Sequence, residues 1–164
     1  MTRQVSVRAA EERDYPAFEA LYLGLLEFDR AHHPQRDSPE YDAIVAARRA
    51  SARTAMASDE RRRTFVATYP LSVILGYISI YLDDPGPAST DGTMLTGVIY
   101  ELFVDAAARG SGAGVALVRV AERWFREHGA QRVKVESFAW NAEAIAFYER
   151  RGYSISDVIL TRWL

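Results

Sequence analysis

The sequence predicts a mixed α/β (α+β) domain built around one sheet, and three observations predict this class. The chain has 164 residues, a length that fits a single domain. Its 49% hydrophobic and 26% charged residues are the proportions of an ordinary globular protein. Its apolar positions alternate between strand spacing and helical spacing, in the order β α α β β β α β α β.

The N-terminal half predicts a short strand followed by two helices. Residues 5–7 alternate in strand fashion, and Asp14 then has the position of an N-cap, with Pro16 in the first helical turn. This first helix should end at His33, because the residue before a proline avoids the α region. Ser38 is the expected cap of a second helix, which could run to about residue 57. The apolar stripe of the first helix consists of Phe18, Leu21, Tyr22, Leu25 and Phe28.

The C-terminal half predicts strands and two further helices. Gly129 and Gly152 stand where left-handed residues close helices, and residues 83–87 have the composition of an exposed turn. The expected elements are strands at 65–67, 73–82 and 98–104, a helix with Leu117, Val118, Ala121, Trp124 and Phe125 on one face, a strand at 133–138, a helix at 142–151 and a final strand region at 153–163.

Composition and charge exclude several classes of protein. The chain has no cysteine, which excludes a disulfide scaffold, a thiolate zinc site and a cysteine nucleophile. The net charge of −2 gives no basis for nucleic-acid binding. No run approaches the roughly 18 apolar residues of a membrane span, and the charged N-terminus lacks the apolar core of a secretory signal. We therefore expect a cytoplasmic protein that binds neither nucleic acid nor a membrane.

A glycine-rich segment, residues 109–114, joins an apolar strand to an amphipathic helix and points to phosphate binding. The first backbone N–H groups of a helix are free and its dipole is positive there, so such a start binds anions, and glycine lets the backbone approach the ligand. A P-loop is excluded because the segment has no lysine, and a dinucleotide fingerprint fails because Val115 replaces the third glycine. A connector that binds no ligand remains the alternative.

Two motifs together resemble the GNAT family of N-acetyltransferases. Arg109, Gly112 and Gly114 match the family's acetyl-CoA signature, Arg/Gln-x-x-Gly-x-Gly/Ala, after the Leu-Phe-Val strand end at 102–104. The family's later motif, an asparagine followed by a helix with Phe-Tyr and then Gly-Phe/Tyr, is matched by residues 141–153. The resemblance covers about residues 100–153 and is looser elsewhere.

The resemblance implies one GNAT-like acetyltransferase domain over residues 1–164. Its expected sheet is central, twisted and mostly antiparallel, with about six or seven strands and helices on both faces. A V-shaped splay should separate the strands at 98–104 and 131–138. The cofactor-binding core would span about residues 96–153, and the acceptor-site helices about residues 14–57.

The family binds acetyl-CoA as co-substrate, and the matching positions imply where it would lie here. Backbone amides of the glycine-rich segment would hold the pyrophosphate, and the pantetheine would run along the preceding strand as an added strand does. Asn141 is a helix cap that could also contact CoA. No metal is expected, because the adjacent His32 and His33 lack further ligands at usable spacing. The implied cofactor-binding residues are Leu102, Phe103, Val104, Arg109, Gly110, Ser111, Gly112, Ala113, Gly114 and Asn141.

The implied chemistry is direct attack of an amine on the thioester, which needs no cysteine. The family's general acid, which protonates the departing thiolate, corresponds to Tyr148. Glu101 is the candidate general base, with Glu136 on the neighbouring strand as the rival. Tyr148 as a core residue and Glu101 as an edge or solvent-facing carboxylate are the structural alternatives.

The expected acceptor is a primary amine on a small molecule or a peptide. A protein N-terminus or lysine is one alternative, and a non-catalytic acyl-CoA-binding sensor is another. A homodimer is possible, as for many members of the family. Acidic residues of the acceptor region could attract a cationic amine, and these are Glu27, Asp29, Asp37, Asp83 and Asp84.

Overall fold

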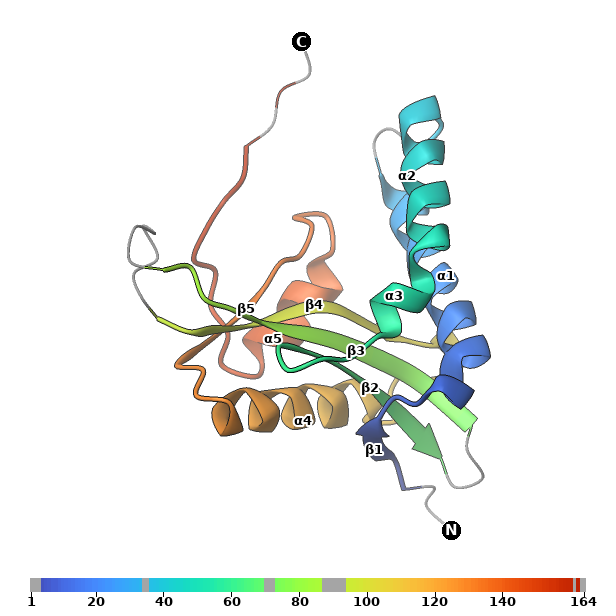
Figure 1. Cartoon of the computed structure of the whole chain (residues 1–164). Coiled ribbons are helices and arrows are strands. Elements are labelled where there is room, and N and C mark those ends of the chain that lie inside the picture. The colour runs from blue at the N-terminus through green and yellow to red at the C-terminus, as the bar shows by residue number, and fades with distance from the viewer. Residues whose placement is uncertain (1–3, 34–35, 70–72, 87–93, 161, 163–164) are drawn as a thin grey trace.

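The computed structural model describes residues 4–33, 36–69, 73–86, 94–160 and 162. Its centre is a five-stranded sheet of order β1-β2-β3-β4-β5, in which only the β4–β5 pairing is parallel (Figure 1). The strands are β1 (Ser6–Ala9), β2 (Arg62–Tyr69), β3 (Val73–Asp83), β4 (Thr96–Val104) and β5 (Arg132–Val135). The helices are α1 (Tyr15–His32), α2 (Pro39–Ala50), α3 (Ala52–Met56), α4 (Ala113–Glu127) and α5 (Ala142–Glu149), with short 3₁₀ turns at Glu12–Asp14 and Ala106–Ala108.

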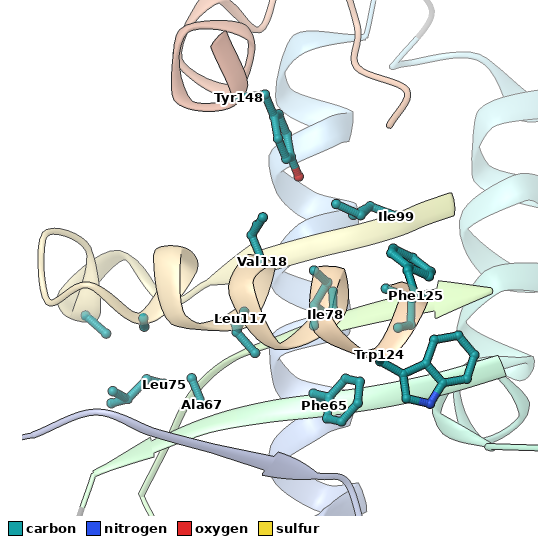
Figure 2. Packing of buried hydrophobic residues seen from close by; sticks show 14 residues of the cluster. Phe65, Ala67, Leu75, Ile78, Ile99, Leu117, Val118, Trp124, Phe125 and Tyr148 are labelled. Carbon is teal, nitrogen blue, oxygen red and sulfur yellow. The ribbon is translucent and has the colours of Figure 1, made fainter. Parts of the chain in front are cut away.

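Helices cover both faces of the sheet, as expected. The α4-side core joins α4 and Tyr148 of α5 to one face of the sheet (Figure 2). The α1-side core joins α1 and α3 to the other face. Alternate side chains of a strand point to opposite faces, so β3 contributes Ile78 to the α4-side core and Tyr77 to the α1-side core.

A β-bulge in β4 changes which face its side chains meet. Ser79 pairs with Glu101, but the next residue of β3, Ile80, pairs with Ile99, which leaves Tyr100 as the extra residue. Without the bulge, residues 99 and 101 would share a face. With it, Ile99 enters the α4-side core while Glu101 meets Tyr77 on the other face.

The predicted splay next to β4 is confirmed. Strand β5 pairs with β4 only from Thr96 to Ile99, opposite Arg132 to Val135. Beyond Ile99 the edge of β4 away from β3 has no strand partner among the described residues. This unpaired edge leads directly to the glycine-rich segment.

The expected number of six or seven strands is wrong, because the sheet has five. Residues 136–138 are not strand; the chain turns there, and the Asn141 N–H donates to the Phe138 carbonyl at 2.9 Å. Residues 153–160 and 162 are not strand either, since none of the described strands lies beside them to complete a ladder; residues 161 and 163 of that predicted strand lie outside the described residues.

Several helix ends match the sequence, and two match it only in part. The Tyr41 N–H donates to Ser38 Oγ at 3.2 Å, and Gly129 and Gly152 have φ of +81° and +87°. Asp14 is the N-cap residue of α1, as predicted, but its side chain makes no capping hydrogen bond, because its carboxylate accepts two hydrogen bonds from Arg8 at 2.6 and 2.7 Å. The second helix breaks at Ser51, whose hydroxyl donates to the Arg48 carbonyl.

Among the described helices, none combines the length and apolar character needed to cross a bilayer.

Candidate functional site

The glycine-rich segment forms an open loop at the start of α4. Gly110 and Gly112 have φ of +77° and +88°, a region that L-residues with a side chain rarely adopt. A Cβ added at either position would meet no atom within 4 Å, so both glycines border open space. Gly112 is the N-cap of α4 and has no side chain to cap its first turn. The loop therefore offers the positive end of a 15-residue helix to an anion.

Helix α5 packs against the beginning of α4, beside this loop. A Cβ added at Gly114 would lie 3.4 Å from the Phe147 ring and 3.8 Å from Val104 Cγ2, which are ordinary van der Waals distances, so α4, α5 and β4 meet at this position. The Asn141 side chain accepts a hydrogen bond from the Ala144 N–H at 3.1 Å and caps α5. The second motif is thus held beside the first.

Tyr148 is buried, with 7% of its surface exposed. Its ring lies 5.1 Å from the Phe147 ring and 5.2 Å from the Tyr153 ring. Figure 2 shows its hydroxyl directed from α5 towards Ile99 and Val118. Burial raises the pKa of Tyr148 well above its ordinary value near 10. The phenol is therefore protonated at neutral pH, as an ordinary tyrosine also is, and burial makes it a weaker acid than an exposed one.

Glu101 is buried rather than solvent-facing, with 7% of its surface exposed. Arg48 of α2 forms an ion pair with one carboxylate oxygen, and the Tyr77 hydroxyl donates to the other at 3.0 Å. Arg48 Nε also donates to the Tyr22 hydroxyl at 3.4 Å. The rival carboxylate, Glu136, is 75% exposed and pairs with Lys134 at 3.3 Å.

The bulge at Tyr100 places the two candidate catalytic groups on opposite sides of β4. Tyr148 belongs to the α4-side core with Ile99, whereas Glu101 faces α2 and Tyr77. The segment between them is where β5 stops pairing. A reacting group lying at this splay would have a proton donor on one side and a carboxylate on the other.

The sequence did not reveal the partners of Glu101 or an aromatic group that links α1, α2 and the turn before α5. Arg48 and Glu101 are 53 residues apart in sequence, and only the fold brings them together. In the aromatic group, Trp140 stacks on His32 at 4.6 Å and on Phe138 at 5.4 Å, with interplanar angles of 11° and 12°. The members of this aromatic group are Phe28, His32, His33, Tyr41, Phe138 and Trp140.

Of the predicted acidic acceptor residues, Asp29 is influenced by the charge of Arg48, the partner of Glu101. It is half-buried on α1, and desolvation raises its pKa against the opposing charges of Arg48, His33 and His32. Asp37 is exposed and pairs with Arg36 at 3.6 Å. Residues 87–93, which follow the predicted acceptor residues Asp83 and Asp84, lie outside the described residues.

A cavity of about 460 Å³ lies between α4 and the end of α5. Three arginines and one glutamate make it basic, and the Arg151 Nε is buried without a hydrogen-bond partner. Its lining residues are Val115, Val118, Arg119, Glu122, Arg150 and Arg151. The described part of the chain holds no group of three or more His, Cys, Asp or Glu side chains placed to bind a metal ion.

Comparison with known proteins agrees with this geometry. A sequence model described as the acetyltransferase (GNAT) family matches residues 18–153. Mycothiol acetyltransferase of Corynebacterium glutamicum is 37% identical over 59 residues, which are 36% of this chain. The matched stretch spans 20% of that relative's own length.

Two solved structures share the whole fold. The tetramutant of the BH1408 protein from Bacillus halodurans superposes with a TM-score of 0.79 at 20% identity, covering 97% of this chain and 99% of that chain. Aminoglycoside N-acetyltransferase AAC(6')-Iy in complex with CoA superposes with a TM-score of 0.73 at 13% identity, covering 100% and 97%. At these identities the likeness concerns the fold alone.

Proposed function

Because the chain belongs to the acetyltransferase (GNAT) family, we propose that it transfers the acetyl group of acetyl-CoA to a primary amine. The observation that carries this proposal is the arrangement around β4. An open glycine loop at a helix start lies beside an unpaired strand edge, with Tyr148 on one side of that strand and Glu101 on the other. A binding module needs the loop and the edge, but it does not need the two proton-transfer groups.

The loop and the strand edge are the proposed binding site for the donor. Acetyl-CoA would supply an acetyl group activated as a thioester. Backbone amides of residues 109–114 would hold its pyrophosphate, since the open space at Gly110 and Gly112 lets an anion approach the start of α4. The free edge of Leu102, Phe103 and Val104 can bond an extended chain as another strand would. The basic α4–α5 cavity adds positive charge beside this site.

Tyr148 is the proposed general acid. Its hydroxyl is directed into the α4-side core near Ile99, and burial keeps the phenol protonated. A donor held in place contributes roughly 10²–10⁴-fold to a rate. Asn141 supports this role indirectly, because it caps the helix that carries the tyrosine.

Glu101 is the proposed general base and takes the ammonium proton through water. Arg48 and Tyr77 hold its carboxylate in one orientation. These two residues are therefore positioning residues. Both also restrict the water positions around the carboxylate, because each already donates to one of its oxygens.

A cationic small-molecule amine is the proposed acceptor. Asp29 and Glu101 place two carboxylates near one guanidinium, that of Arg48, and the aromatic group lies alongside on α1 and α2. Aromatic faces and carboxylates both attract ammonium groups. The fold likeness to an aminoglycoside N-acetyltransferase is consistent with an acceptor of this kind.

An acceptor screen with acetyl-CoA tests the proposal. Polyamines, amino acids, aminoglycosides and peptides with free N-termini or lysines would be offered, and both thiol release and the mass of the acetylated amine would be followed. We expect at least one cationic small amine to be acetylated, and the Tyr148→Phe protein to be slower with the same amine. Binding of CoA with no acetylation of any amine would instead indicate a non-catalytic sensor, and acetylation of peptides alone would indicate a protein acetyltransferase.

A further inference from the structure

Two tyrosines lie on one face of the sheet, just beyond the proposed base. Alternate residues of β3 share a face, so Tyr81 lies on the same side as Tyr77, which donates a hydrogen bond to Glu101. The Tyr100 ring lies 6.2 Å from the Tyr81 ring, edge to face, with an interplanar angle of 63°. Both tyrosines therefore lie on the α1-side face of the sheet, on the strands that carry Tyr77 and Glu101.

These two tyrosines lie outside the α1-side core. That core takes Tyr77 and Phe103 from the same strands, but neither Tyr81 nor Tyr100. Tyr100 is 61% exposed and Tyr81 is half-buried, whereas Val98, which pairs with Tyr81 across the strands, is buried. We call Tyr81, Val98 and Tyr100 the tyrosine platform. It is a surface that the apolar part of another molecule can cover.

The tyrosine platform is continuous with the proposed base. Tyr100 is the bulge residue and immediately precedes Glu101 in β4. Burial lowers the pKa of Arg48, while nearby tyrosines, Tyr100 among them, raise it. Arg48 is the ion-pair partner of Glu101, so Tyr100 lies within electrostatic reach of that pair. A molecule whose amine nitrogen is held at Glu101 can therefore rest its neighbouring atoms on Tyr100.

The charges beside the tyrosine platform are paired with one another. Arg48 forms its ion pair with Glu101, and Lys134 pairs with Glu136 at 3.3 Å. Lys134 is the partner of Val98 in the β4–β5 register, which places this second ion pair beside the platform. Each of these two cations has a carboxylate of its own, so the platform offers aromatic surface rather than surplus negative charge.

We propose that the tyrosine platform selects an acceptor in which an apolar ring is joined to the primary amine by a short chain. The ring would pack on Tyr100 while the amine reaches Glu101, because rings attract one another in offset and edge-to-face arrangements. This inference rests on the proposed function, since it names the acceptor class of the same site. Tyr81 and Tyr100 are specificity-determining residues in this scheme, and neither transfers a proton.

A comparison of three amines is the first test. Phenethylamine, hexylamine and cadaverine would each be offered with acetyl-CoA. We expect kcat/KM for phenethylamine to exceed that for either open-chain amine at least about tenfold, chiefly through a lower KM. Equal values for phenethylamine and hexylamine would overturn the proposal. A preference for the diamine cadaverine would also overturn it, and would point to Asp83, an exposed carboxylate at the end of β3.

Removing the Tyr100 ring is the second test. Tyr100→Ala should lower kcat/KM for phenethylamine about tenfold through KM and leave that for hexylamine nearly unchanged. Tyr100→Phe keeps the ring and should keep the preference for phenethylamine. Val73→Ala is the matched control and should also keep it, because Val73 is an apolar residue, 56% exposed, at the opposite end of β3 from Tyr81. Calorimetry with CoA would check that each variant still binds the donor.

The results also separate this inference from the proposed function. If none of the amines offered to the chain were acetylated, the proposed function would fail and the inference with it. If amines were acetylated but Tyr100→Ala kept the wild-type preference, the chain would still be an acetyltransferase, and the tyrosine platform would have no part in selecting its acceptor.

Discussion

Arg48 and Glu101 form an ion pair that fastens helix α2 to strand β4, with the Glu101 side chain 5% exposed and that of Arg48 30% exposed. The bulge at Tyr100 makes this contact possible, because it directs Glu101 away from the α4-side core. The Tyr77 hydroxyl, on β3, donates a hydrogen bond to the other oxygen of the Glu101 carboxylate. One contact therefore ties the helices of the proposed acceptor side to the strand of the proposed donor side.

Removing the cation of this pair should destabilise the fold. In Arg48→Met the buried Glu101 carboxylate keeps only its bond from Tyr77, and an undersatisfied buried acceptor costs about 1–3 kcal/mol. Urea denaturation would measure the loss. Glu101→Gln in the same background should recover part of it, because the amide carries no charge. If the double variant were less stable by the sum of the two single losses, the two side chains would not be coupled.

The Glu101→Gln protein should lose acetylation rate most at neutral pH. A substrate amine with a pKa near 10 is mostly protonated at pH 7, so removal of its proton by the base matters most there. As pH rises the free amine becomes abundant, and the ratio of variant to wild-type kcat/KM should approach one. Glu136→Gln is the matched control and should leave the profile unchanged, since that carboxylate is exposed on β5's continuation. A constant ratio for Glu101→Gln from pH 6.5 to about 9.5, or a pH-dependent one for Glu136→Gln, would remove Glu101 from the role of base.

Gly112→Ala should weaken CoA binding while the fold persists. A Cβ at this position points into the open space where the phosphate is proposed to lie, and we expect at least a tenfold loss of affinity, or about 1.4 kcal/mol. Alanine is also strained at the positive φ of residue 112, which should lower the free energy of unfolding by roughly 1–2 kcal/mol. Gly129→Ala controls for that strain, because Gly129 has φ +81° at the opposite end of α4. Calorimetry with CoA should show normal affinity for Gly129→Ala. If both variants lost the same CoA affinity, backbone strain would explain the loss and the phosphate site would not.

The local patterns predicted most of the fold, whereas the long-range contacts could not be predicted. Ser38, Gly129 and Gly152 determine their own turns through short-range chemistry, so their positions were readable from the sequence. Asp14 is of a residue type that caps helices, but in the folded chain its carboxylate accepts hydrogen bonds from Arg8 on β1 instead of from the first turn of the helix. Likewise, Arg48 on α2 carries no sequence signal that it meets Glu101.

The site was predictable to the extent that it is built from contiguous motifs. The glycine loop and the α5 motif each lie within a short stretch, and the fold brings them together at Gly114 and Phe147. The bulge at Tyr100 depends on the register in which β4 pairs with β3, and the residue pattern of β4 alone does not predict that register. The final strand at 153–163 was predicted from apolar and β-branched residues, but none of the described strands lies beside residues 153–160 to complete a ladder.

Stability should fall at alkaline pH. Burial raises the pKa values of Tyr77, Tyr148 and Tyr153 above 10, so the folded chain keeps protons that the unfolded chain releases. Their contribution is complete below about pH 10 and is lost as pH rises above it, by roughly 1.4 kcal/mol per pH unit for each tyrosine. Urea denaturation at pH 8 and pH 11 would measure this loss of unfolding free energy. A free energy of unfolding that stays constant over this range would contradict the assignment of buried, protonated phenols.

Tyr148→Phe tests the proposed acid most directly. The substitution removes one oxygen and keeps the ring between Phe147 and Tyr153, so the melting temperature should change little. Binding of acetyl-CoA should persist, because the loop at 109–114 and the β4 edge are its proposed contacts. The value of kcat should fall about 10- to 10³-fold, the range expected when a general acid is lost.

Tyr153→Phe is the matched control, because Tyr153 is a partly buried tyrosine whose pKa is also raised, and its hydroxyl donates to Glu122 at 2.9 Å. That variant should lose about 1 kcal/mol of stability with its hydrogen bond and keep normal turnover. Normal turnover in Tyr148→Phe, measured on the same preparation as its melting temperature, would make Tyr148 a core residue and remove it from the mechanism.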